Sequence, residues 1–144
     1  TGVFASYNNS AGNLEALKAP AIGKMNENHY LTMDGQEVFK FAIKVIPESI
    51  NAVLQKANLT LDDIDYVVCH QANYRIIKNV YKKMKSSEEK FYMNLQEYGN
   101  TSAASIPLAL GEMDEKGLLK SGNKIICVGF GGGLTWGAVL MEWS

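Results

Sequence analysis

The chain has 144 residues, of which 47% are hydrophobic and 20% charged, and its formal net charge is −1. This length suffices for one compact domain with a core and is too short for two. The nearly neutral charge gives no indication of nucleic acid or a membrane surface as a general partner. No apolar run approaches the roughly 20 residues that cross a bilayer, and no signal peptide is recognisable, so we expect a cytoplasmic protein.

Strands and helices are predicted to alternate in the first half of the chain. Residues 1–7 indicate a strand that is already under way at Thr1, so we expect a fragment of a longer protein, and a polar loop then runs to Asn13. Apolar residues at helical spacing cover 35–58, where Pro47 is expected to kink or split the helix.

The second half continues the alternation. After a small capped turn formed by Thr60 and Asp63, the pattern predicts a strand at 66–69, a helix at 73–85, a strand at 91–95, a helix from Asn100 that Gly117 ends, and strands at 124–128 and 134–143. The order β-α-β-α-β-α-β-β predicts an α/β fold with a mainly parallel mixed sheet and a final antiparallel hairpin.

The two cysteines, Cys69 and Cys127, both lie in apolar runs typical of buried strands. Two core thiols favour a reducing compartment over a disulfide scaffold. The histidines, His29 and His70, do not combine with these cysteines at zinc-binding intervals, so we expect no metal site.

His70 follows the strand at 66–69 and precedes a helix, which is where open α/β sheets place their active crevices. A single histidine specifies no reaction, so a structural role remains an alternative. Cys69 is its neighbour, but successive side chains of a strand point to opposite faces. We therefore reject a Cys69–His70 catalytic dyad.

Two further segments could serve a site. Asn100 lies at a strand-to-helix junction, where a helix cap is the structural alternative to a functional role. Phe130-Gly131-Gly132-Gly133 joins the last two strands, and because no helix follows, the segment is not a phosphate loop. It is either a flexible hairpin or a source of backbone N–H donors for an oxyanion.

The helix at 73–85 carries basic residues on one stripe, namely Arg75, Lys78, Lys82 and Lys85. Its apolar residues fall on the opposite side. The stripe is either a solvated face or a docking face for an acidic partner.

Read together, three segments closely resemble the β-ketoacyl-acyl-carrier-protein synthase III family: HQANYRI at 70–76, GNTSAASIP at 99–107 and FGGGLTWG at 130–137. LTMDGQEVF at 31–39 resembles the start of the first helix in that family's carboxy-terminal half. The likeness follows the chain in order over nearly its whole length.

The resemblance implies that residues 1–144 form the carboxy-terminal half of a thiolase fold, without the half that bears the nucleophilic cysteine, which neither Cys69 nor Cys127 matches. His70 and Asn100 match the family's catalytic histidine and asparagine. Gly132 matches an oxyanion-hole glycine, and Phe130 matches an active-site phenylalanine that steers decarboxylation. Arg75 matches a contact to acyl carrier protein, which Lys78 and Lys82 would extend.

The implied activity starts fatty-acid biosynthesis by condensing an acyl-CoA primer with malonyl-acyl carrier protein, with loss of carbon dioxide. The resemblance implies no cofactor or metal, a homodimer for the intact enzyme, and an inactive fragment. Two alternatives stay open. A related polyketide-type acyltransferase would share His70 and Asn100 but accept other acyl groups, whereas a binding module would hold the carrier protein without catalysis.

Overall fold

The structure is a computed structural model that describes residues 2–12, 16–18 and 32–144. Thr1, Asn13, His29 and Leu31, which entered the expectations above, lie outside these ranges. The strands are β1 (Gly2–Ser10), β2 (Leu17–Lys18), β3 (Thr32–Met33), β4 (Tyr66–Cys69), β5 (Lys124–Gly131) and β6 (Thr135–Glu142). The helices are α1 (Gly35–Ala57), α2 (Tyr74–Lys83), α3 (Leu95–Tyr98) and α4 (Ser105–Glu115), with 3₁₀ turns η1 (Leu61–Asp63) and η2 (Ser102–Ala104).

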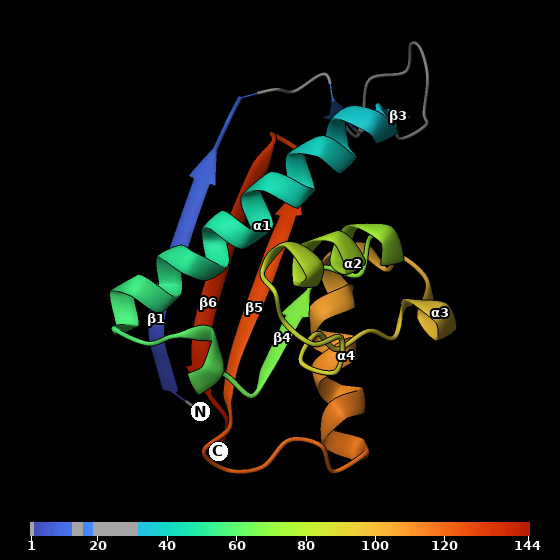
Figure 1. Ribbon diagram of the computed structural model, residues 1–144. Coiled ribbons are helices and arrows are strands. Elements are labelled where there is room, and N and C mark those ends of the chain that lie inside the picture. Colours follow the sequence, from blue (N-terminus) through green and yellow to red (C-terminus); the bar gives the residue numbers. More distant parts are fainter. Residues whose placement is uncertain (1, 13–15, 19–31) are drawn as a thin grey trace.

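The main sheet has the strand order β1-β6-β5-β4 (Figure 1). β4 and β5 pair in parallel, and β6 runs antiparallel to both β5 and β1. Three of these four strands therefore share one direction, and β6 alone is reversed. This arrangement confirms the expected mixed sheet, with β5 and β6 as its antiparallel hairpin.

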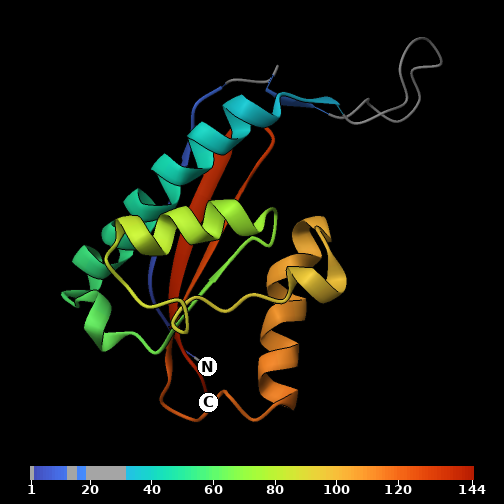
Figure 2. The ribbon, with the colours of Figure 1, turned by 45° about the vertical axis from the view of Figure 1, so that its right-hand side comes forward.

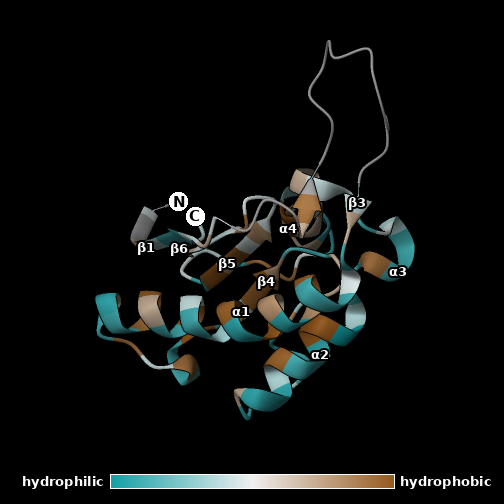
Figure 3. Cartoon of the chain, turned by 90° about the horizontal axis from the view of Figure 1, so that it is seen from above, coloured by the Kyte–Doolittle hydropathy of each residue, from teal (hydrophilic) through white to brown (hydrophobic). Residues whose placement is uncertain are grey.

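Helices cover both faces of the sheet. α1 and α2 lie on one face and α4 lies on the other (Figures 2 and 3). The alternation along the strands follows this layering, because Cys69 and Ile126 join the core under α1 and α2, whereas Val68 and Ile125 join the core under α4. Strands buried on both faces read as continuous apolar runs, which is why β4 and β5 were recognisable in the sequence.

α1 has well-defined ends. The side chain of Asp34 accepts hydrogen bonds from the backbone N–H groups of Gln36 and Glu37, and Asn58 adopts the left-handed conformation after the last turn. Pro47 lies inside the helix without dividing it, so the expected split does not occur. The residues on its core side, including Ile46 and Ile50, are fully buried and hold both halves of the helix against the sheet.

Several expected elements differ from the structure, since β1 continues to Ser10 and α4 begins only at Ser105. The strand predicted at 91–95 is a single parallel bridge between Phe91 and Val67, and Leu95 already begins α3. The backbone N–H of Asn94 donates to the Gln71 side chain at 3.2 Å, which diverts the segment from the sheet. α2 ends at Lys83, so the expectation that Lys85 belongs to the helix was wrong.

Gly137 in β6 is packed against β1. A Cβ atom at this position would lie 2.7 Å from the carbonyl oxygen of Tyr7, whereas a Cβ at Gly111 in α4 would meet nothing within 4 Å. We expect Gly137→Ala to lower the free energy of unfolding by about 1–3 kcal/mol through overpacking. Gly111→Ala should instead raise it by about 0.5–1 kcal/mol, because alanine favours a helix over glycine. Urea denaturation of both variants checks this, and equal shifts would contradict it.

Candidate active site

A cavity of about 490 Å³ opens where β4 and β5 end. His70 enters it from the end of β4, and Phe130 and Gly132 enter from the β5–β6 hairpin. Asn100 and Ser105 line it from the segment that leads into α4. The carboxyl ends of two parallel strands thus bring together residues that lie far apart in the sequence, as open α/β sheets commonly do.

His70 is held on several sides. Its backbone N–H donates to the carbonyl of Val128 at 2.7 Å, which extends the parallel pairing of β4 with β5 by one residue. Its ring meets the ring of Phe130 edge to face at 5.2 Å between centroids. Nδ1 of His70 lies 2.7 Å from Oγ of Ser105. Burial lowers the pKa of His70 below its usual 6.5, so the ring is neutral at pH 7.

Asn100 is oriented by its own loop. Its side-chain oxygen accepts the backbone N–H of Ser102 at 3.0 Å, which occupies the acceptor end of the amide. The NH₂ group is left as the end that can donate to a ligand. Asn100 is not the N-cap of η2 or α4, which are Thr101 and Ala104, so the helix-cap alternative was wrong. Its contact to Ser102 orders the loop and is compatible with a donor role, because the two use different ends of one amide.

The glycine segment closes the cavity beside an aromatic cluster. The ring centroids of Phe130 and Phe41, on α1, lie 6.4 Å apart, and those of Phe41 and Trp136, on β6, lie 5.3 Å apart. Both pairs meet edge to face. Gly133 has φ +129° and leaves no room for a Cβ, which would stand 2.6 Å from the side chain of Thr135. The hairpin is therefore fixed on one side by aromatic packing and on the other by a position that requires glycine.

Two polar residues of the site were missed by sequence reasoning. Ser105 and Gln71 are both almost fully buried, and the Gln71 backbone N–H donates to Oγ of Ser105 at 3.2 Å. In the sequence, Ser105 is one of several small residues that follow Asn100. Neither its type nor its spacing distinguished it from its neighbours, and only the fold brings it to His70.

Neither cysteine belongs to the cavity. Cys69 is buried in the core under α1 and α2, and Cys127 packs against the core under α4. Burial raises the pKa of each thiol to about 12. The thiolate is the reactive form of cysteine, so both residues are poor nucleophiles at neutral pH.

We therefore expect no acyl transfer to this chain from a thioester. Incubation with labelled acetyl-coenzyme A followed by mass spectrometry should leave Cys69 and Cys127 unmodified. As a control, the same reagent should label a small-molecule thiol of ordinary pKa. Stoichiometric acetylation of either cysteine would contradict the prediction.

The basic stripe lies outside the cavity, on α2. Arg75 and Lys82 are exposed and Lys78 is half-buried. Among the described residues, none of the three forms an ion pair. The guanidinium of Arg75 lies 5.9 Å from the ring centroid of Phe39, whose neighbour Val38 lines the cavity. Arg75 thus lies close to residues that line the cavity without lining it itself.

Within residues 2–12, 16–18 and 32–144, no group of three or more His, Cys, Asp or Glu side chains could hold a metal ion. In the same ranges, no helix is long and apolar enough to cross a membrane.

Comparison with known proteins decides the family. The sequence model described as 3-oxoacyl-[acyl-carrier-protein (ACP)] synthase III C terminal matches residues 54–143, more than half of the chain. The chain belongs to this family. Beta-ketoacyl-[acyl-carrier-protein] synthase III of Clostridium tetani is 59% identical over 117 residues, or 81% of this chain and 35% of that protein. The Clostridium novyi protein of the same name is 60% identical over 79% of this chain and 35% of its own length.

Solved structures of synthase III proteins share the fold. The structure from Thermus thermophilus superposes with a TM-score of 0.93 at 36% identity, covering 99% of this chain and 46% of that one. The structure from Aquifex aeolicus gives a TM-score of 0.89 at 41% identity, covering 98% of this chain and 44% of that one. The chain therefore spans between about a third and a half of the length of the relatives it matches.

Proposed function

We propose that this chain is the carboxy-terminal half of a condensing enzyme that begins fatty-acid biosynthesis by joining an acyl primer from acyl-CoA to a malonyl unit on acyl carrier protein. The observation that carries the proposal is that two neutral hydrogen-bond donors, on His70 and Asn100, line one cavity. The family to which the chain belongs supports the same activity.

The residue types suit a decarboxylation. When the bond between the malonyl methylene carbon and its carboxylate breaks, carbon dioxide leaves and the electron pair becomes an enolate on the thioester. The neutral His70 ring and the Asn100 amide stabilise the charge that develops on the thioester oxygen. As neutral donors, they do not hold the substrate carboxylate as a full cation would, so they favour the transition state over the ground state.

The enolate carbon then attacks an acyl group carried as a cysteine thioester, and the cysteine leaves as a thiolate. A backbone N–H at Gly132 would receive the oxyanion of this second step, beside Phe130. The nucleophilic cysteine must come from an amino-terminal half, because burial raises the pKa of Cys69 and of Cys127 to about 12. Residues 1–144 are thus one domain of a larger enzyme, which we propose to be a cytoplasmic homodimer that needs no metal or organic cofactor.

The basic stripe suits the carrier protein. Acyl carrier proteins are acidic, and Arg75, Lys78 and Lys82 form a cationic face that has no internal ion pair among the described residues. Because Arg75 lies close to residues that line the cavity, a carrier bound there could direct its thioester to His70.

The pH dependence provides one test of the neutral donor. Protonation of His70 would remove the neutral donor, and burial lowers its pKa below 6.5. The kcat/KM for malonyl decarboxylation should therefore fall to half of its maximum only at a pH below 6.5, as the pH passes through the lowered pKa. A rate profile from pH 5 to pH 8 checks this. A half-maximal rate at or above pH 6.5 would contradict a buried, neutral His70.

Reconstitution tests the function itself. The complete enzyme is supplied with acyl-CoA and malonyl-acyl carrier protein, and the 3-oxoacyl product on the carrier is detected by mass spectrometry. A polyketide-type acyltransferase would prefer other acyl groups when a panel of acyl-CoA primers is compared. A binding module would retain the carrier and form no product with any primer, which would overturn the proposal.

A further inference from the structure

The hydroxyl of Ser105 connects two elements of the cavity. Ser105 is 2% exposed and begins α4, and it faces the end of β4. Its Oγ lies 3.2 Å from the backbone nitrogen of Gln71 and 2.7 Å from Nδ1 of His70. No other hydrogen-bond partner of this hydroxyl occurs among the residues that the structure describes.

These two partners determine where the hydroxyl proton goes. The Gln71 N–H can only donate, so Oγ of Ser105 accepts that bond. A buried hydroxyl also needs an acceptor for its own proton, and Nδ1 of His70 is the acceptor at hand. Nδ1 must then be unprotonated, and the proton of the neutral imidazole resides on Nε2.

We propose that Ser105 is a positioning residue that fixes His70 as the neutral tautomer protonated on Nε2. The bond at Nδ1 leaves Nε2–H as the ring donor for an anion in the cavity. The opposite tautomer would leave the hydroxyl proton of Ser105 without an acceptor and would offer the cavity a lone pair instead of a donor. The inference rests on the proposed function only in giving that donor a substrate oxygen to meet.

Buried hydrogen bonds also fix Gln71, whose backbone N–H donates to Ser105. Nε2 of the Gln71 side chain donates to the carbonyls of Cys69 at 2.8 Å and Tyr92 at 3.2 Å, and its Oε1 accepts the backbone N–H of Asn94. The side chain of Asn94 in turn donates to Glu112 on α4 at 2.7 Å. The backbone N–H of Gln71, which donates to Oγ of Ser105, is therefore fixed relative to both β4 and α4. The hydrogen bonds from Gln71 through Ser105 to His70 thus join two anchored elements.

Nitrogen-15 NMR tests the tautomer directly. In the complete enzyme labelled with ¹⁵N-histidine, the His70 signals are assigned by their loss in His70→Gln. We expect the wild type to show Nε2 protonated and Nδ1 unprotonated. Ser105→Ala should give a mixture of tautomers, and Ser105→Thr, which keeps the hydroxyl, should restore the Nε2–H form. A wild-type ring protonated on Nδ1 would overturn the proposal without reference to any variant, and so would a tautomer unchanged in a folded Ser105→Ala.

Kinetics separate this inference from the proposed function. Ser105→Ala should lower kcat for malonyl decarboxylation by about 10- to 100-fold, by analogy with the loss of a group that orients a metal-ligating histidine. KM should change little, and Ser105→Thr should recover most of the rate. If Ser105→Ala changes the tautomer of His70 but decarboxylation stays at the wild-type rate, Ser105 is still the residue that positions His70. In that case His70 is not the donor in the decarboxylation, and the proposed function is contradicted.

Discussion

Replacing His70 or Asn100 by alanine in the complete enzyme is expected to slow malonyl decarboxylation by about 10²- to 10³-fold for each variant. This is the range observed when one donor to a developing oxyanion is removed, and it corresponds to about 2.7–4 kcal/mol of transition-state stabilisation. Both side chains line the same cavity, and each has its other polar end engaged within the protein. The remaining donor cannot form the hydrogen bond that the variant has lost. A water molecule in the vacated space does not replace that bond either, because it is not held in the same orientation.

The two half-reactions of the proposed condensation provide the decisive comparison. Transfer of the primer from acyl-CoA to the enzyme's cysteine can be followed separately by mass spectrometry. We expect it to be nearly unchanged in His70→Ala and Asn100→Ala, because no enolate forms in that step. Asn51→Ala is a matched control, since Asn51 is an exposed asparagine on α1 that does not line the cavity. Equal losses in both half-reactions would contradict a decarboxylation role for either residue.

The double variant carries further information. If His70 and Asn100 donate to the same oxygen, the loss in His70→Ala/Asn100→Ala should be smaller than the product of the two single losses, because residues that act as a unit are not additive. A loss equal to that product would indicate that the two side chains act on different groups.

Most strands and helices of the sheet layer, and the final hairpin, could be predicted from the sequence because their signals are local, whereas the pairing of β1 with β6 could not. β4 and β5 are buried on both faces and read as short apolar runs, and the capping pair Thr60 and Asp63 marks its own turn. The prediction failed where a hydrogen bond between residues far apart in the sequence determines the local structure. Residues 91–95 have the composition of a strand, but the buried side chain of Gln71 binds the backbone of Asn94 and turns the chain into α3.

The same distinction applies to the site. Its cavity residues could be predicted because His70 and Asn100 each follow or approach an element boundary, and because their segments resemble a known family. The role of Ser105 could not be predicted from the sequence, because serine is common at the start of a helix. Its importance comes from a 2.7 Å approach to His70, across a separation of 35 residues. No pattern within either segment encodes that distance.

Charge reversal at Arg75 is expected to lower kcat/KM for the carrier-bound malonyl substrate by about 100-fold. Arg75 is exposed near the start of α2, where its backbone N–H is capped by Asn73 and its guanidinium lies over the ring of Phe39. Exchanging an attractive contact for a like-charge one costs several kcal/mol, and about 2.7 kcal/mol corresponds to that factor. Most of the loss should appear in KM, since Arg75 does not line the cavity in which we propose that decarboxylation occurs.

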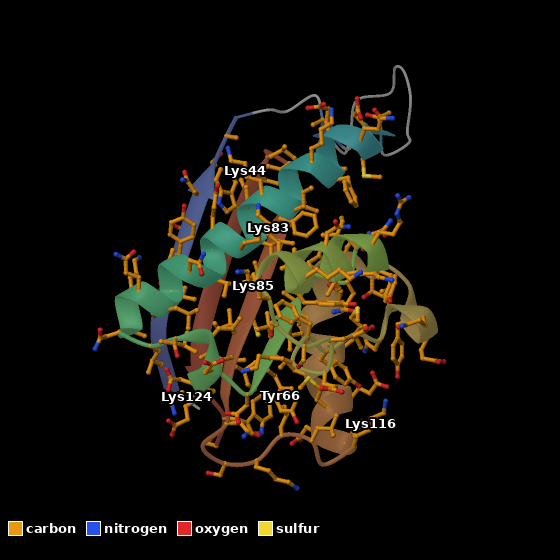
Figure 4. The ribbon with its side chains drawn as sticks, in the orientation of Figure 1. Lys44, Tyr66, Lys83, Lys85, Lys116 and Lys124 are labelled. Atoms are coloured by element: carbon orange, nitrogen blue, oxygen red, sulfur yellow. The ribbon has the colours of Figure 1, made fainter. Side chains whose placement is uncertain are left out.

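A matched variant and a small substrate isolate the effect. Lys120→Glu makes a similar change of charge on an exposed residue between α4 and β5, at the opposite end of β5 from the cavity, and should leave the carrier KM unchanged. In Figure 4, Lys83 and Lys85 lie where the end of α2 approaches α1, whereas Lys116 and Lys124 lie lower in the view, Lys116 beside α4 and Lys124 at the start of β5. Lys83 reaches the carbonyl of Ile43 at 3.4 Å, so it is partly engaged by α1 and is a less suitable control than Lys120.

Salt dependence distinguishes docking from folding. A malonyl thioester of free coenzyme A does not contact a carrier-docking face, so Arg75→Glu should change its use little. The wild-type enzyme should lose carrier affinity as salt rises, because the Debye length falls to about 8 Å at physiological ionic strength. The variant should lose most of that salt dependence, since the contact that salt screens is already gone. If Arg75→Glu lowers kcat/KM equally for the carrier-bound and the free substrate at every salt concentration, the docking role is contradicted. Arg75 then supports the fold through Phe39, and the stripe is a solvated face.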